Sequence, residues 1–401
     1  MTSTVLVEVL LLESCRLSPQ DIKHRVKKFL QTSLPLISPG NVDFSSDDVL
    51  STSCKYIRIP DLDLSSEFRG LFFWWQVDFD VSTYHLHTDG GETESLEADN
   101  EETDTPALIN WPLPSIHFEG LWEALMYDGQ VKNNLLKYTE TALLFSESNV
   151  NSNFVSWNRV VLLHGPPGSG KTSICKALAH KLSIRLQSRY SNSNLVEINA
   201  HSLFSRWFSE SGKLVMRMFD TISDLLSDPQ SFLIVLIDEV ESLSASRKAA
   251  MSGSEPSDAI RVVNALLTQI DRIGRMPNVL ILCTTNITTA VDLAFVDRAD
   301  LKIFLGPPSV NVVQTLFKQS ITSLVQSNLI ESADENDWMS SLENVAQIAS
   351  GLSGRTLRKL PFIAYAFHLT NSKQKTINQF IKALEKAVRQ ELNSRENMEL
   401  G

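Results

Sequence analysis

A glycine-rich segment at residues 164–172 carries residue types that bind phosphate. A strand-like run at 159–163 precedes it, and a helix-like run at 173–182 follows it. Glycines at this spacing let successive backbone N–H groups surround phosphate oxygens, and the helix N-terminus adds a partial positive charge. Lys171 can reach the β- and γ-phosphates of a nucleotide, and the Thr172 hydroxyl can bind Mg²⁺. The segment therefore predicts a phosphate-binding P-loop. Its predicted nucleotide-binding residues are Gly165, Pro166, Pro167, Gly168, Ser169, Gly170, Lys171 and Thr172.

Two acidic residues, Asp238 and Glu239, follow a continuous apolar run at 232–237. Such a run is typical of a strand buried on both faces of a parallel sheet, and ligands bind at the carboxyl ends of such strands. We expect Asp238 to hold Mg²⁺ through water, and Glu239 to polarise an attacking water as a general base. An acidic pair can also simply end a strand, but its place after a P-loop favours the catalytic interpretation.

Three further polar residues could act on a transferred phosphoryl group. Asn286 follows the next apolar run, and it could hydrogen-bond the γ-phosphate or position the water. Arg298 and Arg355 are candidate cations, because a fixed guanidinium facing the developing charge can raise a rate by roughly three to five decades. Each arginine could instead form a surface ion pair, for example Arg298 with Asp297 or Asp300.

Composition limits the classes of partner. The chain has 401 residues, a formal net charge of -11 and a pI near 5.3, which argues against a general binder of nucleic acid or of anionic membranes. No apolar run approaches the roughly 18 residues that span a bilayer, and the N-terminus lacks the features of a secretory signal. The four cysteines are scattered without a C-x-x-C pair. We therefore expect reduced thiols in the cytosol or nucleus, and no structural zinc.

The elements that must position these residues fall into consecutive regions. Residues 1–88 predict a small α+β domain, opening with a strand and then a helix. Residues 89–109 are polar and acidic, and predict a flexible linker. Strand and helix patterns alternate through 110–307, which predicts a parallel, doubly wound α/β sheet. Helical patterns fill 308–401 and predict a small all-helical unit.

Two aromatic groups could be either core or contact surface. A cluster of tryptophan and phenylalanine at 71–81 fits both, and we favour core because it is the commoner fate. Trp207 and Phe208 lie side by side among serine and arginine residues, as in an exposed loop that contacts a partner. A hydrophobic contact at a helix cap explains this second pair equally well.

Together and in this order, the motifs resemble those of AAA+ ATPases. More narrowly, the chain resembles the pachytene-checkpoint, or thyroid-receptor-interacting, AAA+ remodellers over most of residues 110–370. The matching stretches are 156–165 leading into the P-loop, 201–215, 236–243, 255–271, 295–300 and 351–361. The resemblance implies an AAA+ P-loop fold with a C-terminal helical lid, an N-terminal domain that binds substrate or adaptor, and a ring that is typically a hexamer.

The resemblance also implies roles for the residues that bind and hydrolyse ATP with Mg²⁺. The P-loop is similar to the Walker A motif, and Asp238 with Glu239 to Walker B. Asn286 matches sensor 1. Arg355 matches sensor 2, which contacts nucleotide in its own subunit, and Arg298 matches the arginine finger, which acts across a subunit interface.

Other positions match the family's contacts with adenine and substrate. Tyr127 and Asp128 lie where the family packs the adenine. Trp207 and Phe208 fall on the first pore loop, which grips the substrate chain, and residues 248–258 fall on the second. Many relatives carry two arginines near the finger position, but the earlier position here holds Phe295, so the finger rests on a single residue.

The resemblance finally implies a substrate class. The family partly unfolds HORMA-domain proteins and converts a closed form to an open one, with a HORMA-like adaptor in the spindle checkpoint and on chromosome-axis proteins in meiosis. It acts in the nucleus, on chromosomes, and in the cytoplasm, and no direct contact with nucleic acid or membrane is expected. Two alternatives stay open from the residues alone: a nucleic-acid motor or clamp loader, and a nucleotide-gated scaffold without turnover.

Overall fold

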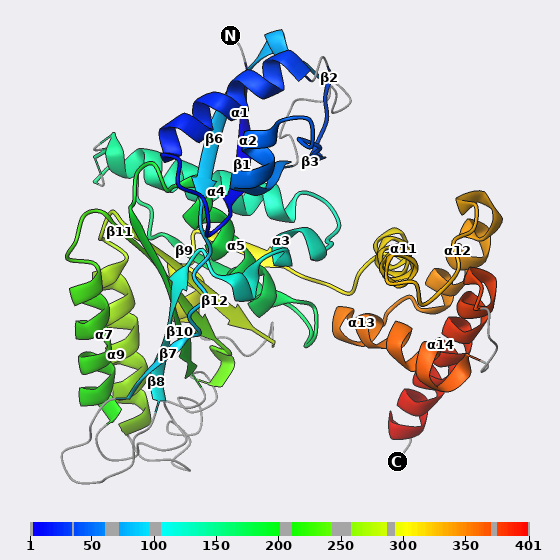
Figure 1. Cartoon of the computed structure of the whole chain (residues 1–401). Helices are drawn as coiled ribbons and strands as arrows, with labels where there is room; N and C mark the ends of the chain where they lie inside the picture. The colour runs from blue at the N-terminus through cyan, green and yellow to red at the C-terminus, as the bar shows by residue number, and fades with distance from the viewer. Residues whose placement is uncertain are drawn as a thin grey trace.

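The computed structural model describes residues 3–33, 36–60, 72–95, 106–148, 150–151, 153–200, 211–242, 258–286, 293–369 and 375–399. They form an N-terminal α+β domain, a large α/β domain and a C-terminal helical lid (Figure 1). The N-terminal domain lies over one end of the large domain, and the lid lies to its side (Figure 1). The predicted fold class is confirmed.

The N-terminal domain is built on a four-stranded sheet in the order β3-β4-β1-β6. Strand β1 pairs in parallel with β6 and antiparallel with β4. Alternate valines of β1 point to one face, where helix α1 covers them, so both the strand and the helix follow the hydrophobic pattern. The elements of this domain are β1 (Ser3–Leu11), α1 (Pro19–Ser33), β2 (Leu36–Ile37), β3 (Gly40–Val42), α2 (Asp48–Ser53), β4 (Cys54–Ile59), β5 (Phe72–Phe73), η1 (Trp74–Gln76) and β6 (Val77–Tyr84).

The aromatic cluster at 71–81 is only partly core, which corrects our preference. Val77 and Phe79 on β6 are buried, but Trp75 is 57% exposed. Its ring stacks on exposed Phe73 with centroids 4.5 Å apart. The reason is local: a 3-10 turn interrupts the extended backbone at Trp74, so the alternation of buried and exposed positions does not run through the cluster.

The acidic segment 89–109, predicted to be a flexible linker, contains strands at both of its described ends. Within it, β7 (Glu92–Ser95) and the start of β8 (Pro106–Leu113) form antiparallel strands at the edge of the large sheet. Leu108 is buried in the core of that sheet. Pairing with distant strands therefore overrides composition here, because an edge strand can keep its charged side chains in water.

The large sheet has seven strands in the order β13-β9-β12-β11-β10-β8-β7. The five from β13 to β10 are parallel, as the alternation of strand and helix predicts, and β8 and β7 add an antiparallel edge. Their carboxyl ends therefore lie along one rim. The parallel strands are β9 (Val160–His164), β10 (Asn192–Asn199), β11 (Ser231–Asp238), β12 (Val279–Thr285) and β13 (Leu301–Phe304).

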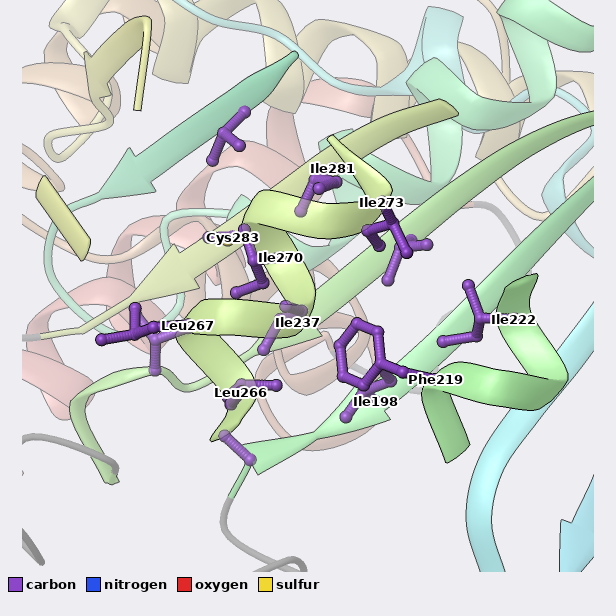
Figure 2. Close-up of a cluster of buried hydrophobic side chains, with 14 of the residues drawn as sticks. Ile198, Phe219, Ile222, Ile237, Leu266, Leu267, Ile270, Ile273, Ile281 and Cys283 are labelled. Carbon is purple, nitrogen blue, oxygen red and sulfur yellow. The ribbon is translucent and has the colours of Figure 1, made fainter. Parts of the chain in front are cut away.

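Helices cover both faces of this sheet. On one face, α7 and α9 pack their apolar sides against β10, β11 and β12, and Figure 2 shows Phe219, Leu266 and Ile270 meeting Ile237 there. On the other face, α4 and α5 bury a second core against β9, β11 and β12. The helices of this domain are η2 (Ile116–Phe118), α3 (Leu121–Ala124), α4 (Val131–Glu147), α5 (Lys171–Arg185), α7 (Ser211–Leu225), α9 (Asp258–Ile273) and α10 (Leu293–Arg298).

The lid is all-helical and has its own apolar core, centred on Phe317, Leu342, Leu360 and Phe380. No helix within the described ranges is long and apolar enough to cross a bilayer. The lid elements are α11 (Val310–Gln326), η3 (Glu335–Asp337), α12 (Met339–Ile348), α13 (Gly354–Ile363), η4 (Ala364–His368) and α14 (Ile377–Glu399).

The N-terminal domain is docked on α5, the helix that follows the P-loop. Lys181 of α5 lies 2.7 Å from the carboxylate of Glu8 on β1, and both side chains are almost completely buried. Beside them, His180 and Tyr56 both contact the carboxylate of Glu119, at 3.2 and 2.6 Å. Buried polar groups that satisfy one another hold two surfaces in one arrangement.

Candidate nucleotide site

A cavity of about 600 Å³ opens at the carboxyl ends of β9, β11 and β12 and extends to the lid. The P-loop lines its floor together with Asp238, Glu239 and Asn286. Lid residues, among them Arg355, face the loop across it. A cleft at this rim of a doubly wound sheet is where a nucleotide is expected to bind.

Two glycines shape the P-loop. Gly168 and Gly170 have φ of +76° and +92°, a region that glycine adopts without strain. A Cβ on Gly168 would lie 2.9 Å from Ser353 Oγ and 3.2 Å from Arg355 Cβ, so the lid approaches the loop closely there. Gly170 also caps α5, which directs the N-terminus of that helix at the loop.

Lys171 lies inside the curve of the loop and is 6% exposed. Its Nζ donates hydrogen bonds of 2.9 Å to the carbonyls of Gly165 and Pro166. Burial lowers the pKa of this ammonium, although the carboxylates of Glu241 and Asp238 act in the opposite direction. The two carbonyls hold Nζ at the loop, where phosphate oxygens could replace them as partners.

Two threonine hydroxyls converge on Asp238. Thr172 Oγ1 lies 3.0 Å from each carboxylate oxygen, and Thr284 Oγ1 donates to Oδ1. Hard oxygen ligands of this kind suit Mg²⁺, which keeps most of its ligands as water and phosphate rather than protein groups. Asp238 and Thr172, both expected as metal ligands, are thus brought together and fit the ion.

Glu239 adopts a left-handed backbone conformation, with φ of +59°. Its N–H donates to Thr284 Oγ1 at 3.3 Å, and its carbonyl accepts from the N–H of Ser242 at 3.1 Å. A non-glycine residue at this φ is strained by roughly 1–2 kcal/mol, so the contacts around it must hold it there. They place Glu239 at the cavity wall beside Asp238.

Asn286 also lines the cavity, and Glu241 holds it. Glu241 Oε1 accepts from the backbone N–H of Asn286 at 3.2 Å and from Nδ2 at 2.9 Å. Neither Glu241 nor Thr284 has a role in the sequence analysis. The signal was present, because Glu241 stands two residues after Glu239 and Thr284 two residues before Asn286.

Arg355 and Tyr127 both reach the P-loop. The backbone N–H of Arg355 donates to the Gly168 carbonyl at 3.1 Å, which ties the lid to the loop. The Tyr127 hydroxyl donates to the Gly170 carbonyl at 3.1 Å, and burial raises its pKa well above the usual value. The neighbouring Asp128 accepts from the N–H of Ser309, the N-cap of α11, at 3.0 Å.

Arg298 lies away from this group. It forms a two-pronged ion pair with Asp271 of α9, at 2.7 and 2.8 Å, and donates to the Ala294 carbonyl. It is not among the described residues that line the cavity. The pair with Asp271 differs from the alternatives Asp297 and Asp300, and Asp300 accepts from the N–H of Asn158 at 2.7 Å.

The predicted substrate-contacting aromatics, Trp207 and Phe208, lie outside the described residues, as do residues 248–257 of the second predicted loop. Phe295, the residue at the earlier finger position, is buried in the sheet core at 2% exposure. That position therefore serves packing in this chain.

Comparisons with known proteins agree with this geometry. The AAA family model, described as ATPase family associated with various cellular activities, matches residues 161–307. The TRIP13-like AAA+ ATPase lid C-terminal domain matches 309–392, and the TRIP13 N-terminal domain matches 1–89. The pachytene checkpoint protein 2 homolog of Xenopus tropicalis is 46% identical over 395 residues, covering 94% of this chain and 91% of the relative. This chain belongs to the pachytene checkpoint protein 2 (TRIP13) family of AAA+ ATPases.

Further comparisons agree in sequence and in three dimensions. The Homo sapiens homolog is 44% identical over 413 residues, with 98% of this chain and 95% of the relative covered. The solved structure of C. elegans PCH-2 matches with a TM-score of 0.79 and 34% identity, covering 98% of this chain and all of that one. A chain of an E. coli HORMA:CdnC:Trip13 complex shares the fold, with a TM-score of 0.55, 16% identity and coverage of 70% and 94%. As a TRIP13-family AAA+ protein, the chain binds nucleotide and is an ATPase.

Proposed function

We propose that this ATPase uses hydrolysis to remodel HORMA-domain proteins, converting a closed form to an open one. The observation that carries the proposal is the N-terminal domain, which matches the TRIP13 N-terminal domain and is docked on α5 by the buried pair Glu8–Lys181. Nucleotide binds at one end of this helix and the N-terminal domain at the other, which suits a motor that responds to a bound protein. A solved relative occurs in a complex that also contains a HORMA protein, which supports the substrate class.

At the nucleotide, we assign roles from position. The P-loop N–H groups and Lys171 would bind the phosphates, and Thr172 and Asp238 would hold Mg²⁺. Bound there, the ion would supply positive charge that offsets the charge of the phosphates. Glu239 accepts a proton from the attacking water as general base, and Asn286 orients that water. Arg355 brings the lid's cation to the phosphates in the same subunit.

We also propose that the subunits assemble into a ring, typically a hexamer, in which Arg298 acts across the subunit interface. In its own subunit it is paired with Asp271 and lies outside the cavity lining as far as the chain is described. An arginine finger acts on the neighbour's nucleotide, so distance from its own cavity supports this role. Trp207 and Phe208 would grip the substrate chain in the ring's pore. We place this activity in the nucleus, on chromosomes, and in the cytoplasm.

The test is conversion of a HORMA-domain protein, with a HORMA-like adaptor, by the parent and by Glu239→Gln and Trp207→Ala. We expect the parent to turn over ATP faster with substrate and to convert it, and both variants to lose conversion. Robust ATP turnover that does not change with added substrate, with no effect of Trp207→Ala, would agree with an ATPase. It would contradict HORMA-domain proteins as the substrate class.

A nucleic-acid motor is the second reading, and the net charge of -11 disfavours it. The same ATP turnover assay with added DNA separates the two. We expect no stimulation by DNA at physiological salt, whereas a marked stimulation would favour the motor.

A further inference from the structure

Glu241 makes contacts that bear on the role of Asn286. It stands two residues after Glu239, at the start of a helical segment that follows β11, and is half-buried. Its Oε1 accepts from two N–H groups of Asn286, the backbone N–H at 3.2 Å and the side-chain Nδ2 at 2.9 Å. Its Oε2 is buried with no hydrogen-bond partner in the described part of the chain. A buried carboxylate whose hydrogen bonds come from one residue is well placed to fix that residue.

The chemistry of the contact fixes the orientation of the Asn286 amide. The two ends of an asparagine amide are hard to distinguish by shape, and the hydrogen-bond network decides between them. A carboxylate oxygen accepts and does not donate, so the end that faces Glu241 must be the amino group. The carbonyl Oδ1 is then left on the other branch of the amide, in a residue that lines the cavity.

This orientation bears on the two roles that the sequence leaves open for Asn286. A residue that binds the γ-phosphate must offer a donor, because phosphate oxygens are acceptors. A residue that orients the attacking water can offer an acceptor for one of the water's hydrogens. Glu241 holds one of the two amino hydrogens, so the second can still donate to a phosphate oxygen, while the free carbonyl oxygen is the acceptor available to the water.

Glu241 also carries charge close to the phosphate-binding loop. It binds Asn286, which lines the same cavity as Lys171 and the rest of the loop. A negative charge here would be expected to repel phosphate unless hydrogen-bond donors are bound to the carboxylate. The two N–H groups of Asn286 supply those donors.

We propose that Glu241 is a positioning residue for hydrolysis, which holds the Asn286 amide so that its carbonyl oxygen orients the attacking water. This inference rests on the proposed role of Asn286 in the same site. Glu241 acts through Asn286 and is not itself the base.

The test is a double-mutant cycle with Glu241→Ala, Asn286→Ala and the double variant in the full chain. Steady-state ATP turnover gives kcat and KM, and binding of a fluorescent ATP analogue reports an intact site. We expect Glu241→Ala to lower kcat by roughly 10- to 100-fold with KM changed less than about threefold. The double variant should match Asn286→Ala within about twofold, because removing Asn286 removes what Glu241 holds.

Glu241→Gln provides the conservative variant. It keeps an acceptor oxygen for Asn286, so it should lose only about threefold to fivefold in kcat, and it serves the same cycle if the alanine variant does not fold. Losses that multiply in the double variant, or a Glu241→Ala effect confined to nucleotide affinity, would overturn the positioning role. Parental kcat in Asn286→Ala alone would instead overturn the proposed role of Asn286.

Discussion

At the scale of single residues, Thr284 connects the two acidic groups of the site. Its hydroxyl donates to Asp238, and the same oxygen accepts the N–H of Glu239 at 3.3 Å. One side chain thus orients the expected metal ligand and holds the strained backbone of the expected base. A buried hydroxyl that both donates and accepts is hard to replace by an apolar group.

Thr284→Val keeps the shape of the side chain and removes both hydrogen bonds. We expect ATP turnover to fall roughly 10- to 100-fold, since losing about 1–3 kcal/mol of positioning raises the barrier accordingly. Steady-state turnover measures this. Thr322→Val, an exposed position on α11, is the matched control. Parental turnover in Thr284→Val would show that Asp238 and Glu239 hold their places without the hydroxyl.

Gly168→Ala tests how closely the lid approaches the loop. The new Cβ would lie 2.9 Å from Ser353 Oγ, at a φ of +76°. We expect nucleotide affinity to fall about tenfold or more, from roughly 1–2 kcal/mol of backbone strain plus the contact with the lid. Equilibrium titration with a fluorescent nucleotide measures it. Gly120→Ala has a similar φ of +72° with open space around it, and should bind as the parent does. Equal nucleotide affinities for both variants would contradict the close approach of the lid to the P-loop at Gly168.

At the scale of elements, α5 contributes both to the P-loop and to the contact with the N-terminal domain. Its first residues, Lys171 and Thr172, belong to the P-loop. Nine residues after Thr172, Lys181 contacts Glu8 of the N-terminal domain, with Glu123 at 3.4 Å as a second acid. A helix is stiff over this length, so a displacement of the loop can shift the residues that contact the N-terminal domain.

Lys181→Met removes one member of the buried pair and leaves Glu8 without its partner. We expect a loss of roughly 3–5 kcal/mol from the stability of the docked arrangement, seen as earlier thermal unfolding by tryptophan fluorescence. Lys176→Met, on the same helix, breaks the more exposed pair with Glu197 and should lose no more than about 1 kcal/mol. Adding Glu8→Leu to Lys181→Met should recover much of the loss, and no recovery would contradict a dominant contribution of the Glu8–Lys181 pair over the contact with Glu123.

The sequence predicted the elements whose signal is local. The P-loop, the apolar strands that lead to Asp238 and Asn286, and the helical lid all follow from nearby residues. The strands β7 and β8 were missed, because their pairing depends on β10, which lies far along the chain. The partner of Arg298 was missed for the same reason, since only the fold brings α9 beside α10.

At the scale of the whole molecule, polar contacts between domains make the docked arrangement depend on pH. Burial alone would raise the pKa of Glu119, but hydrogen bonds from His180 and Tyr56 outweigh it and hold the pKa below its ordinary value of 4.5. A carboxyl with a lowered pKa in the folded state contributes stability above its unfolded pKa, and that stability is lost as pH falls through the folded value.

Glu119→Gln removes this titration. We expect the parent to lose stability steeply as pH falls below about 4.5, and the variant to be less stable than the parent at pH 7 but to show a shallower decline. Thermal unfolding measured between about pH 3.5 and 7, in steps of roughly half a pH unit, gives both slopes. Identical slopes would show that Glu119 is not held in its charged form by the domain contact.

The most direct measurement is ATP turnover and nucleotide binding in Glu239→Gln beside the parent. The amide is close in shape to the carboxylate but cannot take a proton from water. The site described here predicts that the variant binds Mg²⁺-ATP about as tightly as the parent, while turnover falls roughly 100-fold or more. Turnover near the parental rate would contradict it, because the base would then have to be another residue of the cavity.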